Sequence, residues 1–215
     1  MLCRTLLAPI VEPVTLEEVY NQTSSDADHA DYLTPLIARA RKRFEQRTGR
    51  FLVEQTWQFA LPKFCNTIEI PYAPLQSITS IKYIDNQGQL VTIDSADYRV
   101  IYHGIKATIT PKLGGNWPAP GFKVADAVQI ECVIGHAPVQ NGAIDTNNVI
   151  DPDRYNLAKQ AILVLIADWF RNREDSAPVQ LYSVPNAFKA LCDELAVDLL
   201  WGANILAPLI LGKIL

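Results

Sequence analysis

The residues best suited to bind a charged partner are basic ones in the first quarter of the chain. Six cations fall within twelve positions: Arg39, Arg41, Lys42, Arg43, Arg47 and Arg50. Four of them share one side of a helix through spacings of four, four and three: Arg39, Arg43, Arg47 and Arg50. Such a face can bind DNA phosphates or an acidic partner surface. It can equally be a solvated face whose charges complement the helix dipole, and the sequence leaves both interpretations open.

Residues that could support catalysis are scattered. The three histidines, His29, His103 and His136, lie in separate segments, and none has a metal-ligand partner within four positions. Each is expected to be a surface or turn histidine. Gly114-Gly115-Asn116 is expected to form a turn, and no nucleophile elbow, phosphate-binding loop or zinc-protease motif occurs. We therefore expect no enzyme activity, no catalytic residue, no cofactor and no metal site.

The C-terminal segment is strongly apolar and is the second candidate binding element. Its candidate docking residues are Leu199, Trp201, Ile205, Leu206, Leu209, Ile210 and Leu211. A monomer rarely leaves such a patch exposed to water. The segment is expected either to fold back on the chain's own helices or to dock on another subunit or protein.

Composition limits the classes of protein. The 215 residues are 49% hydrophobic and 20% charged, with a net charge of −4, as in one globular domain of ordinary size. The mildly acidic balance excludes a general nucleic-acid coat. Four dispersed cysteines indicate reduced thiols rather than a disulfide framework. No apolar run reaches the length of a membrane span, so no membrane association is expected.

Hydrophobic periodicity divides the chain into three blocks, residues 1–51, 52–135 and 136–215, in the order helical, β and helical. The first block predicts a helix beginning at Leu16, after a Thr15–Glu18 capping box, and a longer helix over residues 28–48 that stops at Gly49. The middle block is rich in β-branched and aromatic residues between turn signals. Its predicted strands are 53–61, 67–70, 78–85, 90–93, 98–102, 107–110 and 127–134.

The third block predicts a helix from about Asp151 to Arg173, with a buried stripe of Tyr155, Ala158, Ile162, Leu165, Ile166 and Trp169. A further helix is predicted from near Pro185 to about Trp201. The fold class is therefore α+β. Two helical blocks that are distant in sequence form a common core, and an antiparallel β block is inserted between them.

Several short segments, taken in order, resemble one family, the head–tail connector or neck adaptor proteins of tailed double-stranded DNA bacteriophages and prophages. The N-terminal half carries Glu12-Pro-Val-Thr-Leu-Glu-Glu, Thr48-Gly-Arg, Gln55-Thr-Trp, Pro74-Leu-Gln-Ser-Ile-Thr-Ser-Ile-Lys-Tyr-Ile-Asp and Asp97-Tyr-Arg-Val. The remainder carries Trp117-Pro, a strand ending at Gly135, Lys159-Gln-Ala-Ile-Leu, Trp169-Phe, Asn172-Arg-Glu and Val184-Pro-Asn-Ala-Phe-Lys-Ala-Leu. The resemblance covers about residues 10–195.

The resemblance implies a non-enzymatic virion protein at the head–tail junction, assembled in the host cytoplasm. Its implied partners are the portal protein, a downstream neck or tail-completion protein, the DNA passing through the channel, and further copies of itself in a ring of about a dozen. Two features depart from the family: the apolar tail that follows Val184–Leu191, and a longer loop over residues 138–148. The alternative is a nucleic-acid-binding or packaging accessory protein that uses the Arg39–Arg50 helix.

Overall fold

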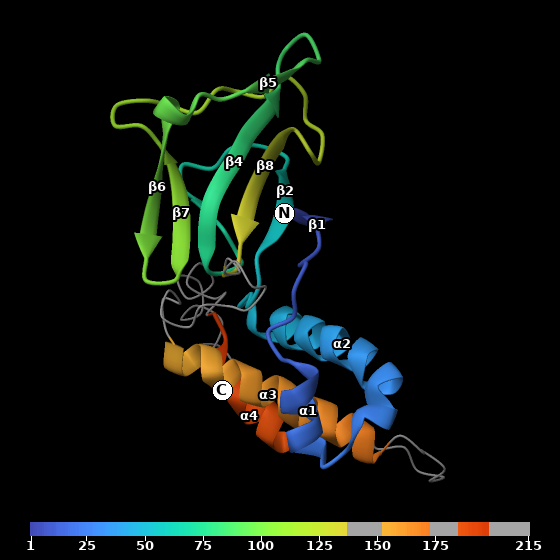
Figure 1. Cartoon of the computed structure of the whole chain (residues 1–215). Helices are drawn as coiled ribbons and strands as arrows, with labels where there is room; N and C mark the ends of the chain where they lie inside the picture. Colours follow the sequence, from blue (N-terminus) through green and yellow to red (C-terminus); the bar gives the residue numbers. More distant parts are fainter. Residues whose placement is uncertain (137–151, 173–184, 198–215) are drawn as a thin grey trace, which may run out of the picture.

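The computed structural model describes residues 1–136, 152–172 and 185–197, which form an α+β fold. In Figure 1 the helices gather at one end of a β block. The α-helices are α1 (Leu16–Thr23), α2 (Ala30–Thr48), α3 (Pro152–Arg171) and α4 (Asn186–Leu195), with single 3-10 turns at Ala27–His29 and Ser95–Asp97. The strands are β1 (Leu2–Leu7), β2 (Gln55–Leu61), β3 (Ile68–Glu69), β4 (Leu75–Ile84), β5 (Leu90–Thr92), β6 (Tyr98–His103), β7 (Lys106–Pro111) and β8 (Val128–Ile134).

Local signals set the ends of the first two helices. The Glu18 amide donates to Thr15 Oγ1 at 3.2 Å, and the Thr15 amide donates to Glu18 Oε2 at 2.9 Å, which completes the expected capping box. At the end of α2, Gly49 adopts a left-handed φ of 67° and its amide donates to the Glu45 carbonyl at 2.8 Å. Both predicted boundaries are confirmed.

The helices from the two ends of the chain share one apolar core. Val19 of α1, Leu33 and Phe44 of α2, Ile162 of α3 and Phe188 of α4 are all fully buried in it. The stripe predicted on α3 is confirmed: five of its residues are buried, and Trp169 is partly buried against the same core. Burial of this many large apolar side chains is the main stabilising contribution at this end of the molecule.

The strands form two sheets. The larger has the order β1-β2-β8-β4-β5, and every neighbouring pair is antiparallel. The smaller has the order β3-β7-β6 and is also antiparallel. Both sheets contribute to a second core, with Phe59, Ile81 and Ile130 from the larger and Ile68 and Ile109 from the smaller. All seven strands predicted from periodicity are present.

Strand β1 is an element that the sequence analysis did not predict. Its residues pair with β2, from Leu2 opposite Ala60 to Leu7 opposite Thr56, so the first residues of the chain belong to the sheet rather than to the helical core. All six residues are exposed. Because neither face is buried, the segment has no alternation of apolar and polar residues, which is the signal that identifies a half-buried strand.

The end of α4 also differs from the prediction. The helix ends at Leu195 rather than near Trp201, because Ala196 leaves the helical conformation with ψ at 133°. The Val197 amide then donates to the Thr48 carbonyl at 2.7 Å. This backbone contact ties the end of α4 to the end of α2.

Candidate interaction surfaces

The structure keeps three of the predicted basic residues on the exposed side of α2 and gives two of them partners. The Arg39 guanidinium lies over the ring of Trp169, 5.1 Å from its centroid, in a cation–π contact between α2 and α3. Arg47 Nη2 lies 2.9 Å from Asp193 Oδ1 on α4. Arg43 is exposed and forms no ion pair within the described parts of the chain. Of the basic residues on α2, Arg43 and its exposed neighbour Lys42 are thus the most open to a partner.

Arg50 does not belong to this face, which corrects the sequence prediction. The left-handed Gly49 ends α2 and turns the chain, so the spacing of three from Arg47 no longer keeps Arg50 on the helix surface. Arg50 is only 4% exposed, and its Nε donates to the Leu195 carbonyl at 3.2 Å. The Arg50 guanidinium therefore contacts other parts of the protein rather than an external partner.

Arg41 is the buried cation that sequence analysis placed only within the basic run. Its Nε donates to Glu12 Oε2 at 2.6 Å, and its Nη1 donates to Glu45 Oε2 at 2.8 Å. Glu45 also accepts from the Gln55 side chain and from the Leu52 amide. The network therefore joins the N-terminal segment, α2 and the first residue of β2. The i,i+4 spacing of Arg41 and Glu45 in the sequence indicates that the two side chains can pair, but it does not indicate that they are buried.

Burial disfavours the charged forms of the side chains in this network. The pKa values of Arg41 and Glu45 are set by different balances between burial and attraction. Desolvation acts to lower the pKa of Arg41, but hydrogen bonds and attraction from Glu12 and Glu45 raise it overall. Desolvation raises the pKa of Glu45, and the neighbouring Arg41 only partly offsets this effect. The ion pair thus favours the charged form of Glu45 in a site whose burial favours the neutral form.

The histidines do not come together. His29 contacts Asp26 at 3.0 Å and packs edge-on against Phe170, while His103 is exposed at the end of β6. His136 is buried rather than at the surface: it follows β8 and lies edge-on against Tyr155. Burial, aided by the charge of Arg50, lowers the pKa of His136 to about 4. Across the described residues, no group of three His, Cys, Asp or Glu could hold a metal ion.

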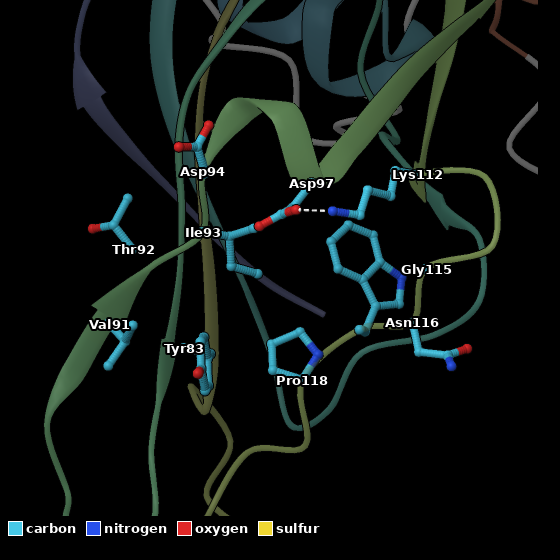
Figure 2. Close-up of a pocket in the computed structure, with 11 residues that line it drawn as sticks. Tyr83, Val91, Thr92, Ile93, Asp94, Asp97, Lys112, Gly115, Asn116 and Pro118 are labelled. Carbon is cyan, nitrogen blue, oxygen red and sulfur yellow. Dashed lines mark hydrogen bonds and ion pairs between the residues drawn. The ribbon is translucent and has the colours of Figure 1, made fainter.

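A pocket of about 480 Å³ opens beside β5, at the far end of the β block from the helices (Figure 2). Asp97 and Lys112 face each other in it, with Lys112 Nζ 2.6 Å from Asp97 Oδ1. Asp94 also lines the pocket, and its Oδ1 accepts from the Ala96 amide at 2.9 Å. The pocket thus presents two carboxylates and one ammonium group. Gly114 and Gly115 form the turn at its rim, as expected.

Two aromatic side chains form part of the pocket wall, beside aliphatic residues such as Ile93 and Pro118. Trp117 and Tyr83 both line it, and Trp117 stacks on Phe64 with ring centroids 4.8 Å apart. The hydrogen bond to Asp97 raises the pKa of Lys112, so its amine stays charged at neutral pH. Carboxylates beside aromatic rings are typical of a site for a cationic side chain.

The docking candidates of the C-terminal segment cannot be placed. All of them lie outside the described residues: Leu199, Trp201, Ile205, Leu206, Leu209, Ile210 and Leu211. The loop over residues 138–148 lies outside them as well. Among the helices that the structure does describe, none is long and apolar enough to cross a membrane.

Comparison with known proteins shows a shared fold. No protein-family model and no curated protein sequence matches the chain. Its structure is similar to a chain in the virion of a native gene transfer agent particle, with a TM-score of 0.65 and 19% identity. It is also similar to chains in the neck of the empty particle, computed with C6 symmetry (TM-score 0.63, 19% identity), and in the neck of the native particle, computed with C12 symmetry (0.60, 21%). Each match covers 92% of this chain and 96% of the other.

Proposed function

We propose that this chain is a non-enzymatic structural protein of the head–tail junction of a phage-like particle. It acts as an adaptor whose copies form a ring between the portal and the next neck or tail component after DNA packaging. The observation that carries the proposal is the fold shared with gene transfer agent neck chains over nearly the whole of both chains. The ordered sequence segments that resemble neck adaptors support it independently.

A ring adaptor needs surfaces for three kinds of partner. Copies of the chain must meet side by side, one end must bind the portal, and the other must receive the next component. A non-closing contact would give filaments, so the side-to-side contact must repeat with a fixed rotation. We assign portal or subunit docking to the apolar C-terminal segment, because seven Leu and Ile side chains in the last eleven residues are costly to leave in water.

The alternative, a nucleic-acid-binding accessory protein, has less support. It depends on a continuous basic face over Arg39–Arg50. Arg41 and Arg50 are buried in internal contacts, and Arg47 is paired with Asp193. The exposed cations that remain fit a limited contact with DNA in a channel or with an acidic neighbour better than an extended binding surface.

Deletion of the gene in a particle-producing strain tests the proposal. We expect DNA-filled heads that carry no tails, together with free tails, and recovery of joined particles when the wild-type gene is supplied in trans. Electron microscopy of purified particles measures the fraction of heads with tails. Normal numbers of tailed, infectious particles in the deletion strain would overturn the proposed function. A defect in packaging that leaves heads empty would favour the accessory-protein alternative.

A further inference from the structure

Strand β1 presents an unprotected edge. It is the first strand in the order β1-β2-β8-β4-β5, and within the described residues nothing pairs with its outer side. Its residues include Leu2 and Leu7, which are 60% and 66% exposed, and a single charge, on Arg4. Proteins normally blunt such an edge with short strands, several charges or a covering loop. An edge this apolar is suited to pairing with another strand.

The opposite edge of the same sheet carries complementary features. Strand β5 is the last in the order and also lacks an outer neighbour among the residues described. Leu90 on it is 49% exposed. The pocket of Figure 2 adjoins this edge and contains the carboxylates of Asp94 and Asp97. One edge is therefore apolar with one positive charge. The other is apolar beside two carboxylates, of which Asp97 is paired with Lys112, so the excess negative charge lies on Asp94.

Strand directions allow the two edges to meet between copies. Four successive antiparallel pairings separate β1 from β5, so these strands run parallel to each other. Copies related by rotation about a ring axis keep their strand directions broadly aligned. The β1 edge of one copy can then meet the β5 edge of the next as a parallel pair. Because the two edges are different surfaces, the contact is heterologous, as a ring requires.

The faces of the sheet match as well. Arg4 lies opposite Gln58, which hydrogen-bonds Glu131 on the outer face of the sheet. Thr92 lies opposite Lys82, whose ammonium is 3.5 Å from the same Glu131. Arg4 and Thr92 thus lie on one face, because directly paired residues share a face. Asp94 follows Thr92 by two positions in extended backbone, so a continuous sheet brings Arg4 of one copy toward Asp94 of the next.

We propose that neighbouring copies of this chain join edge to edge, β1 of one against β5 of the next, with Arg4 bound by the Asp94 carboxylate. The proposal rests on the ring assigned under the proposed function and names the contact that closes it. The contact also provides the cover that β1 lacks.

Charge reversal in the full chain, assembled on portal-bearing heads, tests the contact. We expect Arg4→Glu to lower the number of copies per purified particle by at least about tenfold, since it puts a carboxylate against the pocket. Arg171→Glu makes the same change of charge at an exposed site at the end of α3, outside both sheets, and is expected to leave the copy number unchanged. Adding Asp94→Lys to Arg4→Glu is expected to restore assembly in part. Equal copy numbers for Arg4→Glu and wild type would overturn the proposal.

Disulfide cross-linking tests which faces of β1 and β5 lie together in neighbouring copies, without changing any charge. Cys3 is exposed on β1 opposite the core residue Phe59, and Val91 of β5 lies opposite Tyr83, which packs on the same core. In a Cys65→Ser background, oxidised particles with Val91→Cys are expected to give a ladder of disulfide-linked multimers. Thr92→Cys, on the other face, is expected to give none. No ladder from Val91→Cys, or equal ladders from both, would count against the edge-to-edge contact.

The outcomes separate this contact from the proposed function. Wild-type rings on particles together with a fully assembling Arg4→Glu variant would reject the edge contact and leave the neck assignment standing. Failure of the wild-type chain to join any particle would reject the neck assignment itself, and the edge contact with it.

Discussion

Arg50 Nε donates to the carbonyl oxygen of Leu195, 3.2 Å away, although the two residues are 145 positions apart in the chain. Beside this contact, the Val197 amide donates to the Thr48 carbonyl. Together they fix the last described residues of the chain to the end of α2. The neighbouring His136, whose pKa is lowered by burial and to a lesser extent by Arg50, lies directly after the last strand of the β block. Buried polar groups therefore lie where the ends of α2 and α4 meet the end of the β block.

The Arg41 network predicts a large stability effect from one substitution. Arg41→Ala leaves the buried Glu45 carboxylate without its cation, so we expect the free energy of unfolding to fall by about 3–5 kcal/mol. Glu12→Ala is expected to have a smaller effect, because the Glu12 side chain is 30% exposed. Chemical denaturation measures both. The neighbouring Lys42→Ala is the control and is expected to change stability by less than about 0.5 kcal/mol. An Arg41→Ala variant as stable as this control would contradict the assigned role.

Acid should weaken the fold through His136. Its pKa falls from 6.5 to about 4 on folding, so the unfolded chain binds the proton first as the pH drops. The stabilisation is complete above about pH 6.5 and is lost as the pH falls toward 4, amounting to about 3 kcal/mol. The raised pKa of Glu45 acts in the opposite direction, so comparison with a variant is needed to isolate His136.

The measurement for this effect is the slope of stability against pH. We expect His136→Gln to show a flatter dependence between pH 6.5 and 4 than wild type, whatever its absolute stability. Denaturation midpoints at half-unit pH intervals give the two curves. Parallel curves over this range would show that His136 titrates alike in the folded and unfolded chains, contrary to its buried position.

Local signals in the sequence were sufficient to predict most helices and strands. They were not sufficient to predict the contacts between these elements. The Thr15–Glu18 capping box and Gly49 mark helix ends through interactions within a few residues, so they could be predicted. Strand β1 carries no signal because its order comes from pairing with β2, some fifty residues away. Arg50 was misplaced because a left-handed residue, not the helix period, decides where it points.

The candidate surfaces were predictable only in part, for the same reason. Arg39, Arg43 and Arg47 could be placed together because they share one helix. The partners Trp169 and Asp193 come from α3 and α4, and no spacing rule connects them to α2. The pocket near β5 brings together β4, β5 and the loop after β7, and its residues have no common motif.

Neutralising the exposed basic side of α2 should affect assembly more than stability. We expect Arg39→Gln, Arg43→Gln and Arg47→Gln together to lower the free energy of unfolding by no more than about 2 kcal/mol, since exposed ion pairs and one cation–π contact contribute little. The number of DNA-filled, tailed particles is expected to fall if these cations face the channel or an acidic neighbour. Particle titre and thermal denaturation measure the two effects.

The control for this variant removes as much charge elsewhere. It combines three substitutions at exposed positions of the β block, Lys63→Gln, Arg99→Gln and Lys123→Gln. We expect this control to leave the particle titre unchanged. If both triple variants give wild-type titres, the cations of α2 are only a solvated helix face.

Truncation after Trp201 distinguishes the two roles left open for the C-terminal segment. Docking on the portal or a neighbouring copy predicts a soluble monomer with an unchanged melting temperature that no longer joins particles. Packing on the chain's own helices predicts a melting temperature lowered by several degrees or more, since each kcal/mol shifts it by about 2–8 °C. We expect the first result. A stable truncated protein that completes particles normally would contradict docking.

The most direct test of the account is a reconstruction of the neck from purified, DNA-filled particles that contain this chain. The account predicts a closed ring of copies at the head–tail junction, each with its helices and β block arranged as in Figure 1 and with β1 of one copy beside β5 of the next. A neck built without this chain, or density for the chain elsewhere in the particle, would contradict it.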